Sequence, residues 1–166
     1  MNFEISYDYS PEFVEKASRE FLILRAGGLS IFSVIFSGIA GIAISFSTSY
    51  RWLGGFLVAM VLIYIFQSIN YVRNTKKLAS ELQNKGIVVK FDDEGVIFHG
   101  EDHTGSFKWK RFSQVWITKY AWLFFSYSAN NFTMIPTSSV SKELGSFILS
   151  KMTKDKVKDY QKRKQR

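Results

Sequence analysis

Two long stretches of the sequence carry no charged residue, and they limit what this chain can fold into. The first covers residues 26–50 and the second residues 52–72, with Arg51 between them. Each is longer than the roughly 20 residues that an α-helix needs to cross about 30 Å of hydrocarbon. Neither shows the polar face that a helix of a soluble bundle usually has. We therefore predict a transmembrane helical hairpin over residues 26–72.

Basic residues flank this hairpin mainly at one end. An excess of Lys and Arg marks the cytoplasmic side of a membrane helix, and the connecting turn holds only Arg51. We therefore expect a multi-pass protein of the cytoplasmic membrane with both termini inside. A signal peptide is not favoured, because acidic residues precede the first stretch and its apolar run is too long. The flanking cations are Lys16, Arg19, Arg25, Arg73, Lys76 and Lys77.

Small residues recur at every fourth position in the first predicted span and again in the second. Such stripes let membrane helices approach closely. They could form a homodimer face, or they could pack the two helices of one hairpin together, and the tether between the helices favours the second interpretation. The candidate packing residues are Ser33, Ser37, Gly41, Ser45, Gly55 and Ala59.

Residues 1–25 form an N-terminal arm. Residues 2–7 alternate apolar and polar side chains, which predicts a strand. Ser10 and Pro11 then form the start signal of a helix, with Ser10 as the N-cap. The apolar spacing after Pro11 predicts an amphipathic helix. Because its polar face is not rich in Lys and Arg, we expect it to pack on the C-terminal domain rather than to lie on the membrane surface.

Residues 73–153 are predicted to form a small antiparallel β-domain with a closing helix. The second span should continue as a helix to about residue 85, and Ser141 should cap a helix that reaches about Met152. Between them lie short runs of β-forming residues separated by turn residues. These runs are residues 86–91, 96–99, 106–112, 115–120, 122–128 and 132–135. The predicted fold class is α+β: a transmembrane helical hairpin plus a small antiparallel β-sheet capped by a C-terminal helix.

Aromatic residues are concentrated in this domain. They could line a ligand cleft or face the membrane, but aromatic residues at strand spacing most often form the core of a small sheet. We therefore predict core positions for Trp109, Trp116, Trp122, Phe124 and Phe125.

Catalytic and metal-binding signatures are weak. His99 and His103 flank Glu101 and Asp102, but structural zinc needs four ligands, which often include Cys. The chain contains no Cys, so these residues are interpreted as a polar turn. The sequence has neither a nucleophile elbow nor a phosphate-binding glycine loop. We predict no catalytic residue, metal or cofactor, and hence a protein that is not an enzyme.

The formal net charge is +8, and most of the excess cations follow residue 72. Residues 154–166 are interpreted as a basic tail. Near an anionic leaflet, each Lys or Arg is worth up to about 1 kcal/mol of attraction. Nucleic acid could use the same cations, but a membrane tether makes that partner unlikely, and a solvated helix end is the simplest alternative. The candidate lipid contacts are Lys154, Lys156, Lys158, Lys162, Arg163, Lys164 and Arg166.

Three segments resemble the YcxB-like membrane proteins of bacteria: residues 88–95, residues 108–116 (KWKRFSQVW) and the Ile135-Pro136 step before Ser141. The resemblance implies a bacterial inner-membrane location and a soluble part similar to membrane-anchored pleckstrin-homology-like domains. This chain has Thr137 after the proline, where the family often has a basic residue. The family has no established activity, so the resemblance implies fold and location only.

These observations favour a non-enzymatic, membrane-anchored binding or scaffold module. Its cytoplasmic domain would contact lipid headgroups or a partner protein, and a homodimer is a further possibility. Two alternatives remain open at this point. One is a small membrane-bound enzyme or transporter accessory with a site between the sheet and the hairpin. The other is an immunity-type protein that binds a toxin.

Overall fold

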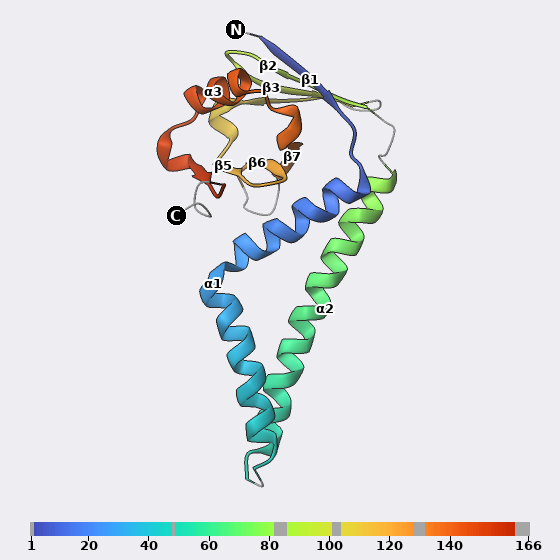
Figure 1. The fold of residues 1–166 in the computed structure, drawn as a ribbon, viewed down its shortest axis with the longest axis vertical. Helices are drawn as coiled ribbons and strands as arrows, with labels where there is room; N and C mark the ends of the chain where they lie inside the picture. The colour runs from blue at the N-terminus through green and yellow to red at the C-terminus, as the bar shows by residue number, and fades with distance from the viewer. Residues whose placement is uncertain (1, 48, 82–85, 101–103, 128–131, 162–166) are drawn as a thin grey trace.

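The computed structural model describes residues 2–47, 49–81, 86–100, 104–127 and 132–161. Two four-stranded sheets and a short helix form a compact domain, and two long helices extend from it as a hairpin (Figure 1). This arrangement confirms the predicted α+β class. It differs from the prediction in having two sheets instead of one.

The two long helices are α1 (Pro11–Ser45) and α2 (Arg51–Glu81). Ser10 caps α1 as predicted, since its Oγ accepts a hydrogen bond of 3.1 Å from the backbone N–H of Phe13. α1 is not one straight rod. Its parts Pro11–Gly28 and Ser30–Ser45 meet at 75°, and Gly27 at the bend has a φ of +69°, a conformation that glycine adopts without steric cost. The first charge-free stretch, residues 26–50, therefore contains a bend near its start, and α1 ends within it at Ser45.

The first sheet has the order β1-β2-β3-β4 and is antiparallel throughout. Its strands are β1 (Phe3–Tyr7), β2 (Ile87–Phe91), β3 (Gly95–His99) and β4 (Thr104–Lys108). Phe3 of β1 is paired with Phe91 of β2, although the whole hairpin separates them in sequence. The N-terminal arm is thus part of the β-domain, and the hairpin is inserted between two neighbouring strands.

The second sheet has the order β7-β6-β5-β8. Its strands are β5 (Gln114–Ile117), β6 (Ala121–Phe125), β7 (Phe132–Pro136) and β8 (Val157–Asp159). β8 pairs in parallel with β5, with Val157 opposite Val115. The prediction that residues 154–166 form a basic tail is therefore wrong for residues 154–159, which form a 3₁₀ turn and this strand.

The closing helix α3 (Lys142–Lys151) follows the prediction, with the Oγ of Ser141 accepting a 3.2 Å bond from the backbone N–H of Leu144. Strand β4 is shorter than predicted. It ends at Lys108, because Trp109–Arg111 form a 3₁₀ turn that carries the chain from the first sheet to the second.

The hydrophobic core has two parts. Trp109, Trp122 and Phe124 belong to the part that lies between the sheets and α3, and Trp116 and Phe125 belong to the part that includes α1. All five side chains are buried, which confirms the core interpretation. Complete burial of a large apolar side chain contributes about 1.5–3 kcal/mol, so these rings are a main source of the stability of the domain.

The first part of α1 packs against the second sheet, as predicted. Phe21 is 1% exposed, and its ring centroid lies 4.5 Å from that of Phe132. Glu20 adds polar contacts, since its two carboxylate oxygens accept hydrogen bonds of 3.3 Å from the backbone N–H groups of Lys119 and Tyr120. This half of α1 is therefore fixed to the domain.

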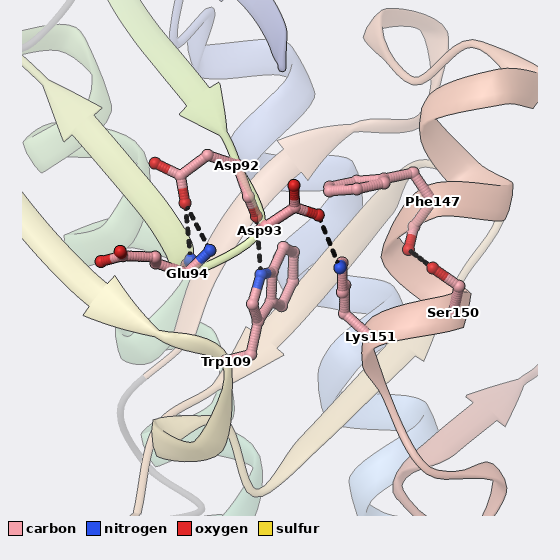
Figure 2. A network of polar contacts seen from close by, with 8 residues as sticks. Asp92, Asp93, Glu94, Trp109, Phe147, Ser150 and Lys151 are labelled. Atoms are coloured by element: carbon pink, nitrogen blue, oxygen red, sulfur yellow. Dashed lines mark hydrogen bonds and ion pairs between the residues drawn. The ribbon is translucent and has the colours of Figure 1, made fainter. Parts of the chain in front are cut away.

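The turn between β2 and β3 is joined to α3 and to the 3₁₀ turn (Figure 2). Asp92 Oδ1 accepts bonds of 2.8 Å from the backbone N–H groups of Glu94 and Gly95, and Asp92 O accepts one of 2.9 Å from Trp109 Nε1. Lys151 Nζ lies 2.7 Å from Asp93 Oδ1. These contacts connect the first sheet to α3 and to the 3₁₀ turn.

Candidate functional site

The hairpin exposes large apolar side chains along most of its length. Among the described residues, α2 is the one helix that alone is long and apolar enough to cross a membrane. α1 adds a second only if its two bent parts count together. Phe36, Ile39, Phe56 and Phe66 are each more than half exposed. The surface of the hairpin is therefore unlike that of the domain, whose aromatic rings are mostly buried.

Small residues bring the two helices together near the hairpin tip. A Cβ added to Gly54 would lie 2.5 Å from Gly41 O and from the backbone N of Ser45. Gly41 and Gly54 are buried, whereas Gly55 and Ala59 are exposed and a Cβ at Gly55 would meet nothing within 4 Å. α2 thus uses Gly54, not the predicted Gly55 and Ala59, at this contact.

The predicted stripe on α1 agrees with the structure in part. Ser45 is half-buried, and its Oγ donates a 2.8 Å hydrogen bond to Gly41 O. Ser37 is also half-buried, but Ser33 is exposed. The helices are in close backbone contact near the tip, and they separate toward the bend in α1 (Figure 1).

An interhelical cleft of about 520 Å³ opens where the two helices diverge. Its lining residues come from the first part of α1, from the start of its second part and from α2. Its lining changes character along both helices. The residues nearer the domain are charged and those nearer the hairpin tip are largely apolar. The charged residues are Glu15, Arg19, Arg73 and Lys76, and the apolar ones include Leu22, Ile23, Ile31, Ile69 and Val72.

The charged end of the interhelical cleft has an ion-pair network. The carboxylate of Glu15 lies 2.7 Å from Lys76 Nζ and 2.7 Å from an Arg19 guanidinium nitrogen. The hydrogen bond from Lys76 lowers the pKa of Glu15, and the charges of Lys76 and Arg19 act in the same direction. Arg73 contributes a third cation to the lining, so the described side chains at this end carry three positive charges and one negative charge.

A second cavity, also of about 520 Å³, lies between the sheets and α2 and has mostly aromatic and aliphatic walls. The hydroxyls of Tyr7 and Tyr9 both donate hydrogen bonds of 3.1 Å to Met134 O beside it. Burial raises the pKa of both tyrosines, so both stay neutral. No carboxylate, imidazole or amine is among the described residues that line this cavity.

The predicted lipid-contact residues divide into two groups. Lys154 is exposed, whereas Lys156 and Lys158 are half-buried. Lys156 Nζ donates a 3.2 Å hydrogen bond to Phe112 O, and Lys158 Nζ lies 5.2 Å from the centroid of the Trp116 ring. The remaining four, Lys162, Arg163, Lys164 and Arg166, lie outside the described residues.

Lys158 shares a groove with Arg25 from the end of the first part of α1. The strand β8 holds Lys158 there by its pairing with β5. Sequence reasoning assigned Lys158 to a tail and did not connect it with Arg25. The signal that could have suggested the connection is Val157, a β-branched residue among the lysines.

The histidine-containing turn is only partly described. His99 Nδ1 lies 3.1 Å from Thr104 Oγ1, and Glu101, Asp102 and His103 lie outside the described residues. Within the described ranges, no three His, Cys, Asp or Glu side chains are grouped as a metal site would require.

These features define a two-sheet α+β domain with a long apolar helical hairpin inserted between its first two strands. Residues 91–150, which run from the end of β2 to α3, match the family model described as YcxB-like protein. The match confirms the family resemblance for this segment of the domain. No curated protein and no solved structure matches the chain.

Proposed function

We propose that this chain is a non-enzymatic, membrane-anchored module of the bacterial cytoplasmic membrane. The hairpin spans the bilayer, and the two-sheet domain rests on the cytoplasmic face, where it contacts anionic lipid headgroups. The observation that carries this proposal is the exposure of large apolar side chains on both helices of the hairpin. In water each of these side chains would order solvent, whereas each contributes about −0.3 to −0.6 kcal/mol on insertion into hydrocarbon.

The length of α2 supports a full crossing. Its charge-free part, residues 52–72, extends about 31 Å at 1.5 Å per residue, which matches a hydrocarbon core of about 30 Å. Tyr50 and Trp52 at one end and Tyr71 at the other lie where aromatic side chains favour the interface.

The second part of α1 is shorter. Ser30–Ser45 extends about 24 Å, so the bend at Gly27 would lie below the membrane surface. A mismatch of a few Å costs only fractions of a kcal/mol per Å. The bend would place the charged end of the interhelical cleft at headgroup depth and its apolar end beside the acyl chains.

The charges support the orientation. Arg51 alone lies at the hairpin tip, and the many flanking cations lie at the domain end, which the positive-inside tendency assigns to the cytoplasm. Arg25 and Lys158 are close to the bend in α1, where they would meet phosphates of the inner leaflet.

The topology supports a relation to pleckstrin-homology-like domains. Two consecutive antiparallel meanders, β1–β4 and β5–β7, are followed by the helix α3. We infer this relation from strand order and the closing helix, and we assign the domain a binding role rather than a catalytic one.

Carbonate extraction tests the proposal. Membranes from cells that make the full chain are washed at alkaline pH, and the pellet and supernatant are probed for the protein. We expect the protein to stay in the pellet with integral membrane proteins and to be released only by detergent. Release by carbonate alone would refute the membrane crossing.

A further inference from the structure

We propose that the interhelical cleft is a binding site for a single anionic phospholipid of the inner leaflet. The inference deepens the proposed function and rests on it, because the lipid would enter the cleft from the bilayer. The volume of about 520 Å³ lies within the range of about 300–1,000 Å³ that is usual for ligand sites.

The lining of the cleft combines charged and apolar side chains, as a binding site for an amphiphilic molecule would. On α1 the lining changes from Glu15 and Arg19 to Ile23 and Ile31 along the chain. On α2, which runs in the opposite direction, it changes from Ile69 to Arg73 and Lys76. Both helices therefore present cations at the same end and apolar side chains at the other, which complements a phosphate joined to acyl chains.

Arg73 is the residue best placed to hold the phosphate. Glu15 already forms ion pairs with Lys76 and Arg19. No described residue forms a salt bridge with Arg73. A guanidinium donates two parallel hydrogen bonds to phosphate oxygens, and such charge-assisted bonds are among the strongest in proteins. The single negative charge of a phosphodiester would also offset one of the two excess positive charges at this end of the cleft.

The bend at Gly27 gives the cleft its shape. Because the two parts of α1 meet at 75°, α1 diverges from α2 beyond the tip contact and approaches it again at the N-terminal end of α1 (Figure 1). Residues from both parts of α1 and from α2 line the cleft between them. The Glu15–Lys76 contact closes the end of this space that lies nearest the domain.

Native mass spectrometry on the full chain, released from nanodiscs with equal amounts of phosphatidylglycerol and phosphatidylethanolamine, tests the proposal. We expect one phosphatidylglycerol molecule to remain bound in preference to phosphatidylethanolamine. Arg73→Gln should reduce its retention about tenfold or more, since it removes charge-assisted bonds to the phosphate. Lys77→Gln removes the same charge from an exposed residue outside the cleft lining and should leave retention unchanged.

A second pair of variants tests the apolar end. Ile69→Trp should fill the cleft and displace the lipid, whereas Ile65→Trp on the exposed surface of α2 should not. Circular dichroism and carbonate extraction establish that each variant is folded and inserted. Equal retention of the two lipids, or equal effects within either pair, would overturn the lipid site while the membrane proposal stands. Failure of the unmodified chain to insert would overturn both.

Discussion

The hairpin and the two-sheet domain have opposite surfaces. In the domain the large rings face inward, with Phe91 and Phe124 at most 1% exposed, whereas Phe36 and Phe66 of the hairpin are 63% and 64% exposed. The helices of the hairpin meet through Gly41 and Gly54, which contribute no apolar bulk. The domain gains stability by removing rings from water. The exposed rings of the hairpin gain nothing from water, and this is the difference that the proposed membrane crossing explains, because hydrocarbon would surround them.

Truncation of one aromatic ring in each region tests the difference between their surfaces most directly. Phe91→Ala should lower the free energy of unfolding by about 3–5 kcal/mol, because it leaves a cavity in a tightly packed core. Phe66→Ala removes the same atoms from an exposed position and should change the stability by less than about 1 kcal/mol. Thermal unfolding of the full chain in detergent micelles measures both. Equal losses would mean that the hairpin ring is packed inside the protein.

Adjacent glycines on α2 test the tip contact. Gly54→Ala places a methyl group against Gly41 O and the backbone of Ser45, and such overpacking costs about 1–3 kcal/mol. Gly55→Ala adds a methyl group in open space and should be neutral. Crosslinking between the two helices reports the tip contact, and it should weaken in the Gly54 variant alone. If Gly55→Ala reduced crosslinking between chains instead, the homodimer hypothesis would gain support.

Adjacent glycines on α1 test the bend. A Cβ would meet nothing within 4 Å at either Gly27 or Gly28, but only Gly27 has a φ of +69°. Gly27→Ala should therefore destabilise the protein by about 1–3 kcal/mol through backbone strain, and Gly28→Ala should not. The shift in melting temperature measures the difference. If α1 were straight at Gly27, the two variants would have the same melting temperature.

The smallest expected effect concerns the Asp93–Lys151 ion pair (Figure 2). The hydrogen bond from Lys151 is the largest cause that lowers the pKa of Asp93 from 3.8 to about 2. A carboxyl whose folded pKa is lowered contributes stability above its unfolded pKa and loses it as the pH falls through the folded value.

Asp93→Asn should therefore flatten the acid dependence of stability between about pH 4 and pH 2, as measured by unfolding at a series of pH values. Glu94→Gln serves as the control, because it removes a neighbouring carboxylate without removing the ion pair. An unchanged acid profile in the Asp93 variant would mean that the pair is open in solution.

The sequence predicts local elements better than it predicts their partners. Ser10 and Ser141 both cap helices as predicted, because capping depends on residues that are near in sequence. The alternation in residues 2–7 and the β-forming residues of 86–91 predict strands, but they do not predict that the two strands pair across the hairpin. The sequence did not predict β8, because a strand of three residues among lysines is too short to show an alternating pattern. Its pairing partner is β5, which is distant in sequence.

In the candidate sites, too, the sequence predicts local features better than it predicts their partners. The spacing of small residues indicates a contact, but helical spacing does not fix which face meets the neighbour, so Gly55 was predicted where Gly54 is used. The interhelical cleft could not be predicted from the charge-free stretches, since it depends on the bend at Gly27. The adjacent glycines at 27 and 28 are the signal that could have suggested a bend.

Cysteine labelling tests the central claim, that the hairpin crosses the bilayer and leaves both chain ends on the cytoplasmic side. The chain contains no Cys, so a single introduced thiol reports one position. Ser49→Cys at the hairpin tip and Ser138→Cys in the domain are treated with a membrane-impermeant maleimide in intact spheroplasts. We expect the thiol at position 49 to be labelled at once and the thiol at position 138 only after lysis. Labelling of position 138 in intact spheroplasts, or of position 49 only after lysis, would contradict the crossing.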